Sequence, residues 1–118
     1  MTTVVHVAIA DDWEAAANIG EYGVSTRGVS VDEAGYVAAV GPAGVQGVLD
    51  ARYGDIRFAV VVVLLDREAL EAGGVVVRAD ERGGFAIEGA IPLGGAEVLR
   101  VVPVERIGGR LRAPSVLD

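Results

Sequence analysis

Residues 56–66, IRFAVVVVLLD, decide the fold class, because they contain the longest apolar run of the chain at 58–65. The four consecutive valines favour a β-strand, since a side chain branched at Cβ fits a pleated sheet. Every position of the run is apolar, so both of its faces are expected to be covered by other elements. The run is also far shorter than the roughly 20 residues that a helix needs to cross a bilayer. We therefore predict that residues 56–66 form the central strand of a buried sheet.

Further strands are predicted on both sides of this run. Residues 3–10 are rich in valine, residues 35–40 form a short apolar segment that stops at a Gly-Pro pair, and residues 96–106 alternate as a closing strand. Residues 75–84 are expected to form a strand that runs into a turn. Residues 85–93 are expected to form a short strand or an extended loop, because a proline cannot donate a hydrogen bond within a central ladder.

Two helices are predicted in the N-terminal half. Asp11 or Asp12 is expected to cap the first, which ends at Gly20. The second has Pro42 in its first turn and carries three apolar residues at helical spacing, namely Val45, Val48 and Leu49. One or two helical turns are expected after the central strand, and a small ribbon near the C-terminus. Strands outnumber helices, so we predict a single α+β domain over residues 1–118, with a strongly curved, mostly antiparallel sheet.

The composition excludes several classes of function. The formal charge of −7 argues against nucleic acid and against anionic membrane surfaces as partners. All ten basic residues are arginine, which removes Schiff-base chemistry, and the absence of cysteine removes disulfides and thiolate catalysis. One histidine without cysteine argues against a transition-metal site. The N-terminus has no features of a signal peptide, so we expect a cytoplasmic protein, as a monomer or a weak homodimer.

His6 and Glu88 are the ionisable residues with the most suggestive surroundings. His6 lies between apolar residues of the first strand, so it either faces a cleft or is a buried or edge histidine bonded to the backbone. Glu88 lies in the apolar segment FAIEGAIPL, where a half-buried carboxylate could act as a general acid or base; an outward-facing glutamate is the alternative. Tyr22 and Tyr36 carry hydroxyls that suit either ligand contacts or structural corners.

The order of these motifs resembles the bacterial family catalogued as domain of unknown function 952, over residues 4–107. The pieces that carry the resemblance are the His6 strand followed by Trp13 and the GEY at 20–22, the LLD at 64–66, and the GAIPL at 89–93. The resemblance implies a fold similar to that of ADP-ribosyltransferases, in which a split, curved pair of sheets flanks a cleft. It also implies that NAD or a nucleotide-like ligand would touch His6.

This chain departs from the family where polar ligand contacts would lie. Family members usually read Gly-Phe-Ile-His-Cys-Ser where residues 35–40 read GYVAAV, and Phe-Pro-His-(Leu or Ile)-Tyr-Gly where residues 85–89 read FAIEG. The family's second and third histidines thus align with Ala38 and Ala86. Its Cys-Ser pair aligns with Ala39 and Val40, and its tyrosine with Glu88. The expected cleft is therefore apolar.

We expect this cleft to hold a hydrophobic small molecule, without a cofactor or a metal. Two roles fit: plain binding or carriage, and cofactor-free catalysis by substrate positioning, such as a cyclisation in a biosynthetic pathway. The alternatives are a residual NAD-binding protein similar to ADP-ribosyltransferases and a non-catalytic interaction module. The predicted catalytic residues are Glu88, His6 and Tyr36, and the predicted substrate contacts are Trp13, Tyr22, Ala38, Val40, Phe85, Ala86 and Ile91.

Overall fold

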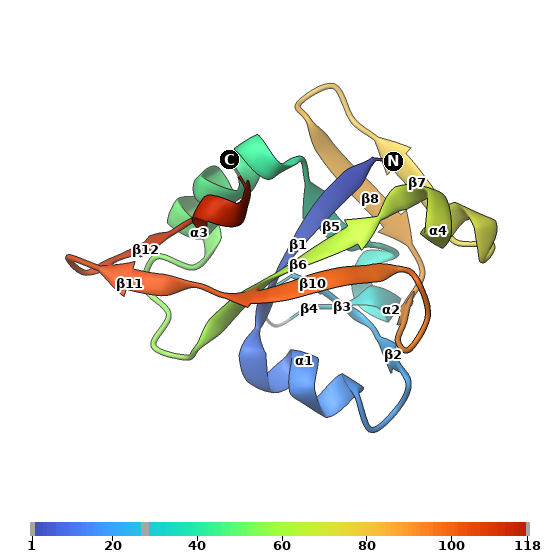
Figure 1. The fold of residues 1–118 in the computed structure, drawn as a ribbon, viewed down its shortest axis with the longest axis horizontal. Coiled ribbons are helices and arrows are strands. Elements are labelled where there is room, and N and C mark those ends of the chain that lie inside the picture. The colour runs from blue at the N-terminus through green and yellow to red at the C-terminus, as the bar shows by residue number, and fades with distance from the viewer. Residues whose placement is uncertain (1, 27–28, 118) are drawn as a thin grey trace.

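The computed structural model describes residues 2–26 and 29–117. Its centre is a twisted, six-stranded antiparallel sheet in the order β10-β6-β1-β5-β8-β7 (Figure 1). The sheet and the few helices around it confirm the predicted α+β class with mostly antiparallel strands. The six strands are β1 (Thr3–Ile9), β5 (Val37–Val40), β6 (Val60–Asp66), β7 (Val76–Ala79), β8 (Gly84–Glu88) and β10 (Val98–Pro103).

The predicted central strand lies inside the sheet, paired with β1 on one side and β10 on the other. Val62 and Val63 are fully buried on opposite faces, as expected for a strand that is covered on both sides. The strand begins at Val60, four residues later than predicted. The reason is that Ile56 still belongs to the turn after the second helix, where its N–H donates to the Tyr53 carbonyl and its own carbonyl accepts from Arg106.

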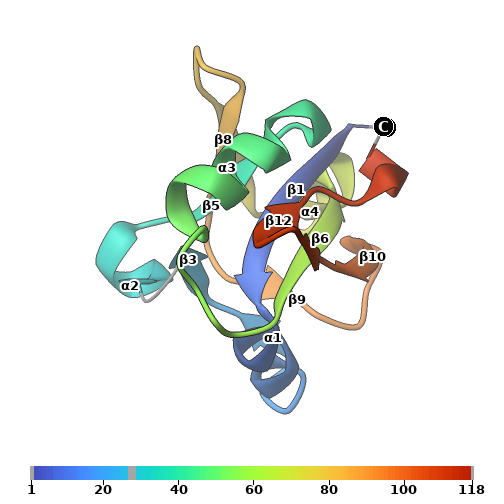
Figure 2. The ribbon, with the colours of Figure 1, turned by 90° about the vertical axis from the view of Figure 1, so that its left-hand side faces the viewer.

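Each face of the sheet carries its own apolar core. On one face, α1 (Ala10–Ala16) and α4 (Arg67–Ala72) contribute Ala16 and Leu70. On the other face, α3 (Val45–Arg52) contributes Val45 and Leu49, and in the side view of Figure 2 it lies in front of the sheet. The helices predicted in the N-terminal half are thus confirmed as α1 and α3. The remaining helical segments are α2 (Val31–Ala34), η1 (Pro42–Gly44) and η2 (Ser115–Leu117).

The predicted cap of α1 is wrong. Ile9 occupies the N-cap position and makes no side-chain cap hydrogen bond, while Asp11 and Asp12 lie inside the first turn. The helix begins directly at the end of β1, because the Ala10 N–H donates to the Ala59 carbonyl and turns the chain there. The two carboxylates still lie at the positive end of the helix dipole, where negative charge is favourable.

The six-stranded sheet is joined in its middle by a single pair of residues, since β1 and β5 pair only between Val5 and Val40, and two three-stranded parts, β10-β6-β1 and β5-β8-β7, can therefore be distinguished. Residues 37–40 of β5 pair with residues 84–87 of β8, so the two segments in which the sequence departs from the family motifs lie side by side in the second part. The remaining strands form three two-stranded ribbons. The ribbons are β2 (Glu21–Tyr22) with β9 (Ile91–Pro92), β3 (Val24–Thr26) with β4 (Val29–Ser30), and β11 (Glu105–Ile107) with β12 (Arg110–Arg112).

The last ribbon confirms the small ribbon predicted near the C-terminus. Gly108 and Gly109 form its two-residue turn, with φ of +61° and +81°, which a residue with a side chain adopts only at a cost. Among the described residues, no helix is long and apolar enough to span a membrane.

Asp66 is the N-cap residue of α4, and replacing it tests how much this cap contributes to stability. Its carboxylate accepts hydrogen bonds from the backbone N–H groups of Glu68 and Ala69, at 3.0 and 3.3 Å. Replacing Asp66 by Ala is expected to lower the free energy of unfolding by about 1 kcal/mol, because two N–H groups of the first turn lose their acceptor. Urea denaturation checks this value. An unchanged midpoint would show that the cap contributes nothing, and Asp66→Asn should retain most of the stability.

Candidate functional site

His6 lies in the core, and its hydrogen bonds identify which ring nitrogen carries the proton when the imidazole is neutral. Its Nδ1 lies 2.6 Å from the Ala38 carbonyl oxygen, and its Nε2 lies 2.9 Å from the Tyr22 hydroxyl. A carbonyl can only accept, so Nδ1 carries the proton and donates it, while Nε2 accepts from the hydroxyl. Burial lowers the pKa of His6 from 6.5 to about 4, against a smaller opposing effect of the bond to Ala38. The imidazole is therefore neutral at pH 7.

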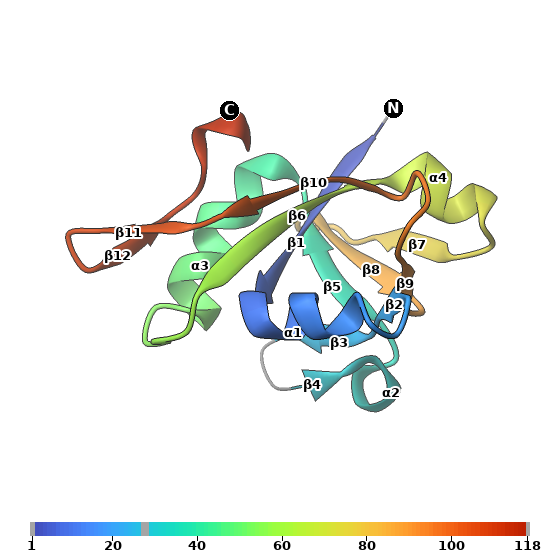
Figure 3. The same cartoon turned by 60° about the horizontal axis from the view of Figure 1, so that its bottom comes forward.

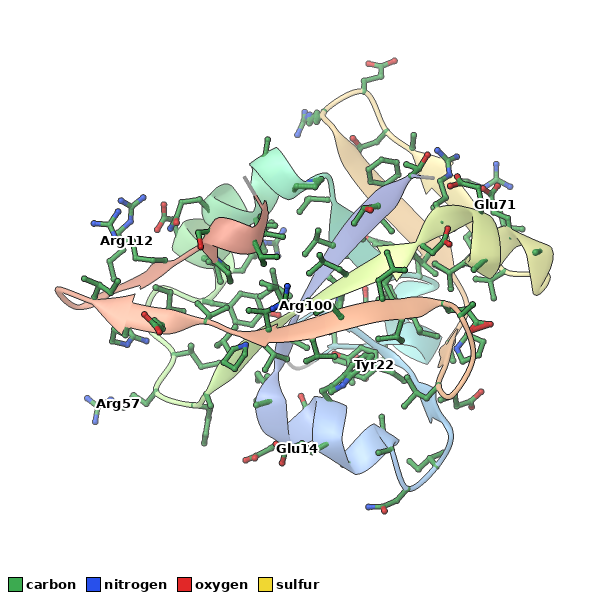
Figure 4. All side chains as sticks on the ribbon, in the orientation of Figure 1. Glu14, Tyr22, Arg57, Glu71, Arg100 and Arg112 are labelled. Atoms are coloured by element: carbon green, nitrogen blue, oxygen red, sulfur yellow. The ribbon has the colours of Figure 1, made fainter. Side chains whose placement is uncertain are left out.

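Tyr22 connects His6 to α1. Its ring meets that of His6 edge-on, with 5.1 Å between centroids, and lies 4.9 Å from the centroid of Trp13. Burial is the main cause that raises the pKa of the Tyr22 hydroxyl, so the hydroxyl stays protonated and remains a donor to His6. Figure 4 shows Tyr22 between α1 and the sheet. His6, Tyr22 and Trp13 therefore form one continuous stack from the sheet to the helix.

A hollow of about 670 Å³ opens beside this stack, and we call it the α1 hollow. Its lining residues belong to α1, to β2 and to the turn that joins β8 to β9, among other segments. Figure 3 shows α1 near the middle of the view, with β2, β8 and β9 to its right. Ile19, with 74% of its surface exposed, stands at the rim of the hollow, and the buried Tyr22 forms part of its wall. Its described lining residues are Asp12, Ala15, Ala16, Ile19, Glu21, Tyr22, Gly23, Val24, Gly35, Glu88, Gly89 and Ala90.

Small residues create the space in the α1 hollow. Half of its lining is glycine or alanine, so backbone and methyl groups form much of the surface. Gly35 and Gly89 have φ of +85° and +146°, values that side-chain-bearing residues rarely adopt, so the two turns that approach the hollow depend on glycine. The result is a cavity bounded by helix α1 and by two turns that contain glycine.

The charges at the α1 hollow are all negative. Asp12, Glu21 and Glu88 contribute carboxylates, and no described lining residue is basic. Glu88 is exposed and forms an ion pair with Arg78, with 2.7 Å between Oε1 and Nε. This placement matches the outward-facing alternative for Glu88, since Ile87 takes the buried side of β8. Within the part of the chain that the structure describes, no group of three or more acidic or histidine side chains could hold a metal ion.

Half of the predicted site residues line the α1 hollow or lie next to Tyr22 in its wall. Tyr22 and Glu88 line the α1 hollow, while His6 and Trp13 contact Tyr22 from inside the protein. Ile91 is fully buried and pairs with Tyr22 across β2 and β9. His6 itself has only 1% of its surface exposed, so the structure places it as a buried histidine bonded to the backbone rather than one that faces a cleft.

The other predicted contacts lie elsewhere. Val40 packs in the core on the α3 face, and Ala38 and Ala86 pair with each other on that same side of β5 and β8. The register explains this placement: Val5 pairs with Val40, so the neighbouring His6 points to the opposite face.

Two aromatic residues of the predicted site also fall outside the α1 hollow. Phe85 packs against the core on the His6 face, with its ring beneath the Arg67 guanidinium at 5.6 Å, and does not line the hollow. Tyr36 is 41% exposed and lies outside the lining, although its neighbour Gly35 belongs to it.

Sequence reasoning missed the α1 wall of the hollow. Ala15, Ala16 and Ile19 follow Trp13 in the segment WEAAANI, where small residues next to one large aromatic leave room for a ligand. That run of small residues between Trp13 and Ile19 was the available signal. Gly89, which directly follows Glu88, was a second one.

Comparison with known structures supports the fold. The chain is similar to the crystal structure of protein CC0527 from Caulobacter crescentus, with a TM-score of 0.76, 17% identity and 98% of each chain covered. A double mutant of the same protein gives a TM-score of 0.76, 15% identity and the same coverage. At this identity the likeness concerns the fold and carries no function. No family model and no curated protein matches the sequence.

Proposed function

We propose that the protein binds a small molecule with an apolar body in the α1 hollow. The observation that carries the proposal is the hollow itself. It has a volume of about 670 Å³, half of its lining residues are glycine or alanine, Tyr22 forms part of its wall, and Ile19 stands at its rim. Pockets for small molecules typically enclose about 300–1,000 Å³ and combine an apolar lining with a few polar groups. Covering the apolar lining would remove it from water and supply the binding free energy.

The charges favour a neutral or cationic ligand. An anion would meet the carboxylates of Asp12 and Glu21, and no basic residue lies among the described lining residues to balance them. The third carboxylate, that of Glu88, already has Arg78 as its partner. The diphosphate of NAD carries negative charge, so the NAD-binding role implied by the resemblance to domain of unknown function 952 gains no support at this hollow. An amine or an uncharged group attached to an apolar body suits it better.

Binding suits this geometry better than catalysis. Both ring nitrogens of His6 are occupied inside the core, and Tyr36 does not line the hollow. Of the three predicted catalytic residues, Glu88 is the one that reaches the hollow, and its carboxylate is held by Arg78. A reaction here would therefore depend on carboxylates and on the shape of the cavity, while a carrier or sequestering role requires only the cavity.

Three probes that share a phenylbutyl or closely related apolar group and differ in charge test the proposal. Phenylbutylamine, phenylbutanol and phenylbutyrate are titrated separately while amide chemical shifts are recorded by NMR. The amine and the alcohol are expected to shift Ala15, Gly23 and Gly89 saturably, and NAD is expected to leave these amides unchanged. The proposal fails if NAD shifts them, or if neither the amine nor the alcohol does.

A further inference from the structure

A second hollow lies at the opposite end of the chain, and we call it the C-terminal hollow. It has a volume of about 460 Å³ and lies between the end of β10, the β11–β12 ribbon and the segment that leads into η2. Figure 1 shows the β11–β12 ribbon projecting from the sheet. The described lining residues are Arg100, Val102, Pro103, Glu105, Ile107, Arg112, Ala113, Pro114, Ser115 and Val116.

The charge of this region is opposite to that of the rest of the protein. Residues 100–117 hold four of the ten arginines and only one of the seventeen acidic residues, in a chain of formal charge −7. Two of these arginines have structural partners. Arg106 donates to the carbonyls of Ile56 and Gly109, and Arg110 forms an ion pair with Asp50.

The other two arginines, Arg100 and Arg112, line the C-terminal hollow. Neither forms an ion pair or a hydrogen bond through its side chain with another residue in the described ranges 2–26 and 29–117. Figure 4 shows Arg100 on β10, near the middle of the view, and Arg112 on the ribbon at its left. Arg112 has Glu105 as its cross-strand partner and also interacts electrostatically with Asp50, so its charge is partly balanced. Arg100 has no such neighbour in its strand register, so its guanidinium is the better anion ligand.

The hollow also offers apolar surface that is open to solvent. Ile107 is 55% exposed and Val116 is 40% exposed, and both line the hollow together with Val102, Pro103 and Pro114. Two of these lining residues are prolines, which restrict the backbone at their own positions. An anion alone would leave the apolar surface uncovered, whereas an anion attached to an apolar body would cover it and reach Arg100 at the same time.

We propose that the C-terminal hollow binds an anionic amphiphile: a carboxylate or phosphate ester whose apolar body lies against Ile107 and Val116 while its charge lies at Arg100. The two hollows would then select opposite charges on similar apolar bodies. This second site does not depend on the function proposed for the α1 hollow, because the two share no lining residue.

The same probe series tests this site through different amides. Phenylbutyrate is expected to shift Ile107, Arg112 and Val116 saturably, and phenylbutylamine is expected to leave them unchanged. Arg100→Gln should weaken phenylbutyrate binding about tenfold, since a hydrogen bond to a charged group is lost, and Arg112→Gln should weaken it less. Arg57→Gln is the matched control, because Arg57 is exposed and lies outside this hollow. Inorganic phosphate distinguishes an amphiphile site from a simple anion site.

Each outcome decides the proposal. It holds if phenylbutyrate binds with the expected loss in the Arg100 variant and if phosphate binds more weakly than phenylbutyrate. It is overturned if phosphate binds as tightly, if the amine binds equally well, if Arg100→Gln and Arg57→Gln behave alike, or if these amides do not shift. If the probes leave the amides of Ala15 and Gly89 unchanged but shift those of the C-terminal hollow, only the function proposed for the α1 hollow is rejected.

Discussion

Lowering the pH from 7 to 4 is expected to reduce the free energy of unfolding by about 3 kcal/mol through His6 alone. The folded state holds the pKa of His6 at about 4, against 6.5 for an unperturbed histidine. The His6 side chain therefore binds a proton near pH 6.5 in the unfolded chain, but only near pH 4 in the folded chain. The stability due to neutral His6 is thus complete above pH 6.5 and is lost as the pH falls toward 4.

The physical reason is the completeness of the hydrogen bonding around the ring. A proton on Nε2 would face the Tyr22 hydroxyl, which would have to rotate and stop donating, inside a core that cannot solvate the new charge. His6→Gln is the matched variant: an amide can in principle donate to the Ala38 carbonyl and accept from Tyr22 without titrating. Urea denaturation at several pH values measures the difference between the two proteins.

Carboxylates also titrate over this range, so the difference between wild type and His6→Gln is the informative quantity. That difference should shrink by about 3 kcal/mol between pH 7 and 4. If both proteins lose stability in parallel, His6 is not held neutral by the fold and the stack described above is incorrect. Asp50, whose pKa is lowered mainly by its hydrogen bond with Arg110, should contribute equally to both.

Filling the α1 hollow is expected to weaken binding there. Ala15→Trp places an indole in the cavity from the exposed face of α1 and should weaken phenylbutylamine binding by at least about tenfold, which corresponds to roughly 1.4 kcal/mol. Ala15 is exposed, so the fold should tolerate the change, and thermal unfolding should move by only a few degrees. Isothermal titration calorimetry measures the affinity.

Ala17→Trp is the control for this experiment. Ala17 is also exposed and lies at the C-cap of α1, but it does not line the hollow. The same indole should therefore leave the affinity within about twofold of wild type, since surface changes away from a site have small effects. Equal losses in both variants would indicate a general effect on α1, and no loss in either would place the ligand elsewhere.

Most of the strands and helices could be predicted, because the sequence patterns that favour them are local. The valine runs of β1 and β6 favour extended chain, and the Pro42 start and spaced apolar residues of α3 favour a helix, whatever the rest of the chain does. The start of α1 could not be placed, because it depends on a hydrogen bond between Ala10 and Ala59, which lie far apart in sequence.

The candidate site was harder to predict because it depends on strand register. Matching residues 35–40 and 85–89 to family motifs treats them as one surface, but successive residues of a strand point to opposite faces. Ala38, Val40 and Ala86 therefore lie on the α3 face, while His6 and Tyr22 lie on the other. The size of the α1 hollow could not be predicted from the sequence either, since the small residues that create it come from several segments that lie far apart in the chain.

The most direct test of this account is where a bound probe lies. Intermolecular nuclear Overhauser effects between phenylbutylamine and the methyl groups of the protein locate it without any mutation. We expect contacts with Ala15, Ile19 and Ala90, which line the α1 hollow. Contacts with Ala38, Val40 or Ala86 instead would place the ligand on the opposite face of the sheet and contradict the account.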